Sequence, residues 1–308
     1  MSAADLAAEV LVPAGARVRR RGPWLQALAR FRRRPFGIAA LLVLLVYVLA
    51  ATVGPRVMPY SEAEIFFQYL NHPIGPSLHG GHLLGTDVIG HDMLTRLMWA
   101  VRDTLSVAIE ASLAAVLIGV CLGALAGYRG GPLDAVVGWL TGVVVTVPAL
   151  VVYLVVVIHF NPAPPWALPV TLGACLWTSM AQAVRASLRT LRAREFVEAA
   201  RAAGASGSRI VFRHLLPNAA GTVIVAGSAV FGQSILIVAT ADFFGFAVNR
   251  PTLGGMIAGV AKVNQIVYPV SEPWWLWVFP IIALALLLVC VNVTADTLAD
   301  VLDPPAGR

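Results

Sequence analysis

The chain has 308 residues, of which 58% are hydrophobic and only 12% are charged, and its mean hydropathy is +0.80. An average soluble domain is about a quarter charged, so this composition excludes an ordinary soluble enzyme. The three cysteines lie in separate apolar runs without CxxC spacing, which argues against a disulfide scaffold and against redox or metal chemistry at these residues. The sequence therefore predicts a polytopic membrane protein.

Stretches without charged residues mark the predicted membrane crossings. They span residues 36–55, 111–128, 135–184, 214–241 and 273–295. A helix needs about 20 apolar residues to cross a bilayer, so the third stretch is long enough for two crossings, with a proline-rich break at 161–165. We therefore expect an all-α fold with six transmembrane helices, at approximately 36–54, 104–127, 135–158, 167–184, 222–241 and 275–294.

Residues 1–35 precede the first predicted helix and form an arginine-rich arm. Trp24, Leu28 and Phe31 fall on one helical face among arginines, which is typical of an interfacial helix at the lipid headgroups. A disordered basic arm is the alternative. A cleaved signal peptide is disfavoured, because the apolar run 36–53 exceeds the usual hydrophobic region of about 7–15 residues.

The distribution of Arg and Lys sets the predicted orientation. With a cytoplasmic N-terminus, 17 of the 22 basic residues lie inside, and the five outside are Arg56, Arg96, Arg102, Arg250 and Lys262. Both termini are therefore predicted to be cytoplasmic. The net charge of +6 comes from basic residues on the predicted cytoplasmic side. The lipid bilayer is therefore the expected partner of these residues, and no nucleic acid is expected.

The longest predicted cytoplasmic loop, about 185–221, begins with a short amphipathic helix. Its thin apolar stripe at helical spacing consists of Phe196, Ala199 or Ala200, and Ala203. On the same helix, Glu198 has Arg194 four residues before it and Arg201 three residues after it, spacings that permit ion pairs.

A tight turn and a second helix follow in the same loop. Gly204 is expected to end the first helix in the left-handed conformation, and Ser206 is expected to cap the second helix. Pro217 limits the second helix before the chain re-enters the membrane. The loop is therefore predicted to be a cytoplasmic helical hairpin with small exposed residues, suited to docking in another protein.

This loop resembles the EAA motif of permease subunits of ABC importers. The matching residues, with the internal spacing of that motif, are Glu198, Ala199, Ala200, Gly204, Leu216 and Pro217. In that family the motif forms the coupling helix, which sits in a cleft of the ATPase subunit. The resemblance therefore implies that these six residues couple the chain to an ATPase.

Other segments resemble the peptide and nickel branch of that family. They are HLLGTD at 82–87, IGHDMLTR at 89–96, GYRGGPLD at 127–134, RHLLPN at 213–218 and LDP at 302–304. The resemblance covers roughly residues 35–305 and implies a permease domain over 36–303 and a tail over 304–308. The chain departs from the branch at DFFGFA (242–247), at Leu253 in place of Trp, and at His91 in place of Arg.

The resemblance implies a second homologous permease subunit, two ABC ATPase domains and an extracytoplasmic solute-binding protein, in a bacterial inner membrane. The implied cargo is a di- or oligopeptide, with nickel or a nickel chelate as the alternative. The sequence has no GxxxxGK[ST] phosphate loop, so ATP hydrolysis is expected in the partner subunits, and no cofactor is expected. A secondary transporter and a non-transporting scaffold are the alternatives from other classes.

Two acidic residues are candidates for the transport pathway. Glu110 lies inside the second predicted helix, where charge is expensive and points to a functional site, although an interfacial Glu paired with Arg102 is the alternative. Asp242 ends the fifth predicted helix and is expected at the outer surface, with a place in the pathway as the alternative.

Histidines and tryptophans in the predicted outer segments have simpler explanations than ligand binding. His72, His79, His82 and His91 lie near Asp87 in the outer loop, and such groups can bind Ni²⁺ or Zn²⁺, but no metal site is expected in this Gly- and Pro-rich segment. The tryptophans Trp274, Trp275 and Trp277 are expected to form an interfacial aromatic belt, with substrate stacking as the alternative.

Overall fold

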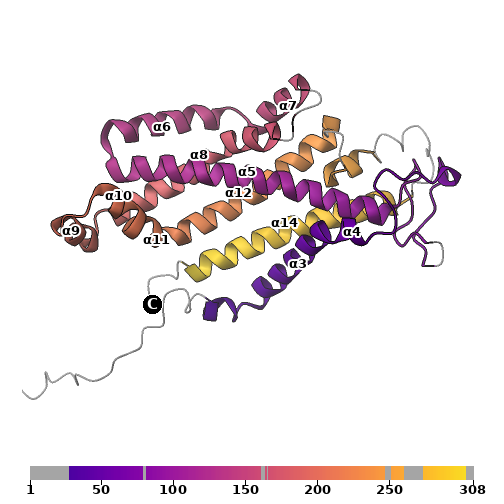
Figure 1. Ribbon diagram of the computed structural model, residues 1–308, viewed down its shortest axis with the longest axis horizontal. Coiled ribbons are helices and arrows are strands. Elements are labelled where there is room, and N and C mark those ends of the chain that lie inside the picture. The colour runs from indigo at the N-terminus through magenta and orange to yellow at the C-terminus, as the bar shows by residue number, and fades with distance from the viewer. Residues whose placement is uncertain are drawn as a thin grey trace, which may run out of the picture.

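The computed structural model describes residues 28–78, 81–160, 164, 166–246, 251–259 and 273–302. The described residues are mainly helical, and their only β-type pairing is an isolated bridge between Thr86 and Asp92. The long helices run side by side along the longest axis of the molecule (Figure 1). An all-α fold is thereby confirmed for this part of the chain.

Helices occupy each of the six predicted intervals. Five are long and apolar enough to cross a membrane: α3 (Pro35–Thr52), α5 (Met93–Arg129), α8 (Ala167–Leu191), α12 (Ala220–Ala241) and α14 (Trp275–Leu302). The third predicted crossing is broken into α6 (Gly131–Thr146) and α7 (Ala149–His159), which meet at a bend of 70°. The described residues therefore contain five spans, or six if the bent pair counts as one.

Helix α5 begins eleven residues before its predicted start at 104. The side chain of Asp92 caps it by accepting a hydrogen bond of 2.8 Å from the backbone N–H of Thr95. Similarly, α8 and α14 extend beyond their predicted ends at 184 and 294. Charge-free stretches mark the part of a helix inside hydrocarbon, whereas the helix itself continues into water.

Glycines bring α5 and α8 into close contact. A Cβ atom on Gly119, Gly123 or Gly127 would lie 2.6–2.8 Å from backbone carbonyl oxygens or the Met180 Cβ of α8. These three glycines recur every four residues on one face of α5, and small residues of this kind allow membrane helices to approach closely. The two helices therefore form one tightly packed unit in the centre of the molecule.

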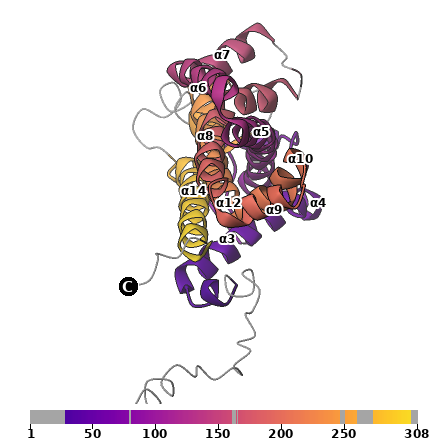
Figure 2. The same cartoon turned by 90° about the vertical axis from the view of Figure 1, so that its left-hand side faces the viewer.

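The remaining long helices pack around this central pair. Helix α12 contacts both α5 and α8, α14 lies beside α12, and α3 lies beside α14 (Figure 2). Between α12 and α14 lies a π-helical turn, η4 (Asp242–Phe246), and a helical segment over 253–259. In that segment the backbone N–H of Leu253 donates a 3.1 Å hydrogen bond to Thr104 of α5.

The segments outside the membrane-crossing helices gather at opposite ends of the molecule. One end carries α4 (Gly54–Val57) and η2 (Phe67–Tyr69), and the other carries α9 (Glu195–Ala202), α10 (Gly207–Ile210), η3 (Val211–Leu215) and α11 (Leu216–Asn218) (Figure 1). Residues 28–31 are helical ahead of α3. Trp24 and the rest of the predicted interfacial helix lie outside the described residues, as does the tail 304–308.

Candidate functional site

The candidate site is the helical hairpin that follows α8, here defined as residues 195–218. Helix α9 forms its first arm, and α10, η3 and α11 form the second arm, which continues into α12. It projects from one end of the helix bundle (Figure 1). The predicted order of short helix, glycine turn and second helix is confirmed.

The turn of the hairpin is a Schellman motif. Gly204 has a φ of +77°, and its N–H donates to the carbonyl of Arg201 at 2.9 Å, while the N–H of Ala205 donates to Ala200 at 3.0 Å. A Cβ on Gly204 would meet no atom within 4 Å. Glycine is therefore required here by the left-handed backbone and not by crowding inside this chain.

Three buried side chains fix the hairpin to the bundle. Val197, Ile210 and Leu215 are each at most 1% exposed, and they pack in one apolar cluster with Val184 and Leu188 of α8. The η3 segment that carries Leu215 is a π-helical turn. Both arms of the hairpin are therefore attached to the end of α8 and should move with it.

The predicted coupling residues lie mostly on the surface of this hairpin. Glu198, Ala199, Gly204 and Pro217 are exposed, whereas Ala200 and Leu216 are half-buried against the cluster below. The spacing on α9 permits ion pairs of Glu198 with Arg194 and Arg201, but neither pair is formed in the structure.

Two further predictions for the hairpin need correction. Phe196 is 39% exposed and the buried residue of α9 is its neighbour Val197, because the side of α9 that meets α8 is turned one position from the predicted stripe. Ser206 does occupy the N-cap position of α10, but its hydroxyl lies 3.4 Å from the Ser208 hydroxyl and caps no backbone N–H.

Tyr128 contacts the hairpin from the end of α5, a role that the sequence did not indicate. The guanidinium of Arg201 lies 5.9 Å from the centre of the Tyr128 ring, and a Cβ on Gly207 would be only 3.1 Å from that ring. The backbone carbonyl of Tyr128 accepts a 3.1 Å hydrogen bond from Arg192. The GYRGGPLD segment therefore supports the hairpin through contacts with residues far away in the sequence.

The same segment also ties α6 to α8. Asp134 accepts hydrogen bonds from Arg185 and Arg189 of α8, and its side chain is only 13% exposed. Charge-assisted pairs of a carboxylate with arginine are among the stronger hydrogen bonds in proteins. The end of α8 is consequently fixed on one side by α5 and on the other by α6, immediately before the hairpin begins.

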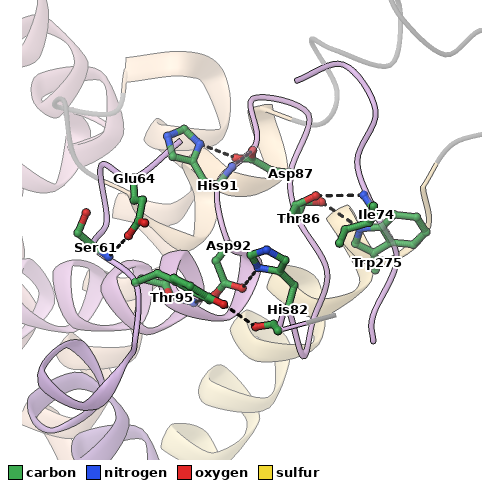
Figure 3. A network of polar contacts seen from close by, with 12 residues as sticks. Ser61, Glu64, Ile74, His82, Thr86, Asp87, His91, Asp92, Thr95 and Trp275 are labelled. Atoms are coloured by element: carbon green, nitrogen blue, oxygen red, sulfur yellow. Dashed lines mark hydrogen bonds and ion pairs between the residues drawn. The ribbon is translucent and has the colours of Figure 1, made fainter. Parts of the chain in front are cut away.

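The motifs at 82–96 build the opposite end of the molecule (Figure 3). His82 donates a 2.9 Å hydrogen bond to Asp92, and both side chains are nearly buried. The rings of Tyr60, Phe66 and Tyr69 surround His82, with centroids 4.8–5.5 Å away. Asp92, which also caps α5, thus holds the loop onto the start of that helix.

A second polar cluster in this loop centres on Asp87. Its carboxylate accepts hydrogen bonds from the His91 ring at 3.0 Å and from Arg96. Burial raises the pKa of this carboxyl group, but the hydrogen bonds from His91 and the charge of Arg96 outweigh burial, so the pKa lies below its ordinary value. Among the described residues no group of three or more potential ligands could hold a metal ion; His79 is not described.

Trp275 makes a specific hydrogen bond that a position in an aromatic belt would not require. Its indole N–H donates a 3.2 Å hydrogen bond to the backbone carbonyl of Thr86, and the Thr86 hydroxyl accepts from the N–H of Ile74 (Figure 3). Trp274 and Trp277 are 51% and 40% exposed. One tryptophan therefore anchors the loop that carries Thr86, and a belt position for the two exposed ones stays a prediction.

The two candidate pathway residues lie in different settings. Glu110 is exposed on α5, and Arg102 stacks over the Trp99 ring at 4.9 Å and forms no ion pair with Glu110 in the structure. Asp242 lies at the end of α12, but it is only 2% exposed and is hydrogen-bonded to Thr252. Asp242 is therefore buried within the fold at the end of α12, and its place relative to the pathway stays a prediction.

Known families and relatives agree with this arrangement. The family model "Binding-protein-dependent transport system inner membrane component" matches residues 119–307, and "N-terminal TM domain of oligopeptide transport permease C" matches residues 22–73. The oligopeptide transport system permease protein OppC of Mycobacterium tuberculosis (strain H37Rv) is 32% identical over 279 residues, which cover 89% of this chain and 92% of the relative. The dipeptide permease DppC of Bacillus subtilis (strain 168) is 31% identical, covering 92% and 86% respectively.

A solved structure shares the fold. A chain of the MetNI methionine ABC transporter in an inward-facing conformation superposes with a TM-score of 0.54 at 19% identity, covering 68% of this chain and 98% of that chain. The family match extends over more than half of the sequence and includes the whole hairpin. The chain therefore belongs to the family of inner-membrane permease components of binding-protein-dependent ABC transport systems.

Proposed function

We propose that this chain translocates di- or oligopeptides in an ATP-driven importer, and that an ATPase subunit docks on the exposed surface of its 195–218 hairpin. The observation that carries this proposal is the division of the hairpin into two sides. Val197, Ile210 and Leu215 are buried against α8, while Glu198 and Ala199 are free on the outside. One side is fixed to the membrane helices and the other is available to a partner.

The proposed coupling works by rigid movement of packed helices. Closure of the ATPase subunits on ATP would displace the hairpin, and α8 follows because three buried side chains join them. Helix α5 moves with α8, since the glycine contacts leave no space between the two backbones. Such a unit would carry the displacement across the membrane, as expected for alternating access by rigid-body motion.

The proposed partners follow from this geometry and from the family. They are a second homologous permease subunit, two ABC ATPase domains and an extracytoplasmic solute-binding protein. Both termini and the hairpin would lie in the cytoplasm, and the His82 loop would lie outside. ATP would be hydrolysed only in the partner subunits, because this sequence lacks a phosphate-binding loop.

The proposed cargo rests on the names of the relatives. Two are oligopeptide and dipeptide permeases, and a third, 30% identical over 92% of each chain, is the glutathione permease GsiD of Pectobacterium atrosepticum. These cargoes share peptide linkages. A peptide of a few residues is therefore the class that we propose for this chain.

Glu110 and Asp242, the two acidic candidates from the sequence, are proposed to affect the rate of uptake from outside the peptide-binding surface. Hydrocarbon does not stabilise a carboxylate, so an exposed Glu110 on a spanning helix requires water or another protein chain on that side of α5. The buried Asp242 would act by holding Thr252 and the segment over 253–259 against the end of α12. Glu110→Gln and Asp242→Asn should each alter the rate of uptake while the complex still assembles.

The test of the proposed function is co-purification from the native membrane. The unchanged chain should retain an ATPase subunit and a second permease, whereas Glu198→Arg and Gly204→Trp should lose the ATPase. Glu62→Arg, a charge reversal in the opposite loop, is the matched control and should retain all partners. An ATPase that binds all three variants equally would refute the docking role of the hairpin.

A direct transport assay separates the cargo from the docking role. The reconstituted importer should accumulate labelled peptides when ATP is supplied and should not accumulate Ni²⁺. Accumulation of Ni²⁺ without peptides would assign the chain to the nickel alternative. Uptake that depends on an ion gradient and not on ATP would assign it to secondary transport.

A further inference from the structure

Three amide side chains on the membrane-crossing helices have no hydrogen-bond partner among the described residues. They are Gln182 on α8, Gln233 on α12 and Asn292 on α14, and all three are exposed. Each lies at least eight residues from either end of its helix, which corresponds to about 12 Å along the helix axis. All three therefore lie within the predicted crossing intervals, Gln233 near the middle and Gln182 and Asn292 two residues inside the ends at 184 and 294.

Two of these amides point away from the centre of the bundle. Gln182 is two positions from both Met180 and Val184, which are fully buried beside α5. Gln233 is two positions from Ile235, which is buried in a cluster with Leu105 and Ala108 of α5. Two positions correspond to about 200° around a helix, so both amides face the side opposite α5.

The third amide lies beside the second. The Oδ1 atom of Asn292 is 3.6 Å from the place that a Cβ on Gly232 would occupy, next to Gln233 in sequence. On the α8 side, the hydroxyls of Ser187 and Thr222 are 3.3 Å apart and join α8 to α12. The view along the helices shows α8, α12 and α14 as neighbours, with α6 and α7 beyond α8 (Figure 2). The three amides therefore belong to one surface, which we name the amide face.

The amide face does not suit contact with lipid tails. An amide without a hydrogen-bond partner is strongly disfavoured in hydrocarbon, and polar side chains in membrane helices accordingly face a partner or a water-filled pathway. The second half of helix α8 repeats the pattern, because the exposed residues Ser179, Ala186 and Thr190 are also polar or small. The exposed surface of α5 carries large apolar residues at 113 and 117. On the amide face, large apolar residues are exposed one turn from the amides, at Leu236 and Val289.

We propose that the amide face lines the transport pathway and that Gln182, Gln233 and Asn292 bind the main chain of a passing peptide. The inference rests on the proposed function and adds the residues that contact the cargo. An amide side chain offers both donors and an acceptor without charge, as a peptide bond does. Recognition through the main chain would accept peptides with different side chains, whereas a charged site would select among them.

The opposite surface of α5 provides an internal comparison. Glu110 lies there, three and seven residues from Leu113 and Leu117, and none of these residues faces α8 or α12. If the pathway instead ran along this surface, Glu110 would control cargo selection and the amides would not. The two surfaces can therefore be distinguished by experiment.

The first test measures peptide uptake by the complete importer in proteoliposomes. The probes are labelled trialanine and trialanine N-methylated at the amide nitrogen of its second residue. Gln182→Leu, Gln233→Leu and Asn292→Leu should each lower kcat/KM for trialanine about three- to tenfold, the effect of one lost neutral hydrogen bond. They should also reduce the preference for trialanine over the methylated peptide, which a general folding defect would not do. Gln233→Asn keeps an amide and should retain most of the uptake.

The second test measures access of water to each position. In a background with Cys121, Cys175 and Cys290 changed to Ala, Gln182→Cys and Gln233→Cys should react with a membrane-impermeant thiol reagent, and trialanine should slow the reaction. Ile109→Cys, on the surface of α5 beside Glu110, is the matched control and should show no protection by trialanine.

The outcomes distinguish a failure of the amide face from a failure of the proposed cargo. Normal trialanine uptake and unchanged preference in all three leucine variants would overturn the amide face while leaving peptide import intact. Protection by trialanine at position 109, with none at 182 or 233, would overturn it as well and move the pathway to the other surface of α5. An unchanged importer that takes up no peptide would refute the proposed cargo itself, and with it the peptide-binding role of the amides.

Discussion

The hairpin at one end of the molecule and the 58–92 loop at the other are stabilised in opposite ways. The hairpin is attached by apolar side chains and leaves charged residues such as Glu198, Arg209 and Arg213 exposed. The 58–92 loop buries its polar groups, with His82 on Asp92 and with His91 and Arg96 on Asp87. The difference suggests that the hairpin presents a surface to a partner, whereas the loop closes on itself and fixes the start of α5.

The largest expected effect comes from removing an apolar anchor of the hairpin. Leu215→Ala should destabilise the attachment of the hairpin to α8 by about 2–5 kcal/mol, the usual range for a buried leucine, because Leu215 is fully buried. Hydrogen exchange should then accelerate over residues 195–218 and not over 82–96. Phe212→Ala is the matched control, since Phe212 is 72% exposed. Equal exchange in the two variants would contradict the anchoring role.

The next effect in size comes from the polar network of the loop. Asp92→Ala removes the cap of α5 and leaves the buried His82 without its acceptor. A lost cap costs about 1 kcal/mol and an unsatisfied buried polar group about 1–3 kcal/mol. Exchange should accelerate over 82–96 while the hairpin stays unchanged. Asp92→Asn keeps an oxygen for the cap and should be milder; if the two variants behave alike, the cap is not the cause.

A smaller effect should follow from acid. The pKa of Asp87 is lowered in the folded loop, so its contribution to stability is fully present above the ordinary Asp pKa of about 3.9. The contribution is lost as the pH falls through the lowered pKa of the folded state. Protease resistance of the loop should therefore decline below about pH 4. Asp87→Asn should be less resistant at neutral pH and should lack the part of the acid response that Asp87 causes.

The sequence predicted the positions of the helices better than it predicted the contacts between them. Hydrophobic length placed a helix in each of the six intervals, and the Gly204 turn followed from the left-handed preference of glycine. The face of α9 was less certain, because Phe196 and Val197 are both apolar and only the position of α8 decides that Val197 is buried. The role of Tyr128 depends on residues 64 or more positions away, so no local pattern could have revealed it.

The residues proposed for the transport pathway are another case in which local sequence is not enough. Glu110 and Asp242 stand out in the sequence because charge is rare in a membrane segment, whereas Gln182 and Gln233 do not, since glutamine is ordinary in helices. Their exposure on one face depends on how α8 and α12 pack against α5. Charge thus identifies candidates from the sequence, and packing is needed to recognise uncharged ones.

The smallest expected effect concerns the contact between a charged side chain of the hairpin and an aromatic ring of α5. Arg201 lies over the ring of Tyr128, and an exposed cation–π contact contributes about 0.5–1 kcal/mol. A double-mutant cycle with Tyr128→Leu and Arg201→Gln should give a coupling energy in this range for opening of the hairpin, measured by hydrogen exchange over 195–210. Tyr128→Phe keeps the ring and should retain most of it. A coupling energy near zero would mean that apolar anchors alone hold the hairpin. A value well above 1 kcal/mol would mean that polar contacts stabilise the hairpin as well as the loop, against the contrast between the two ends.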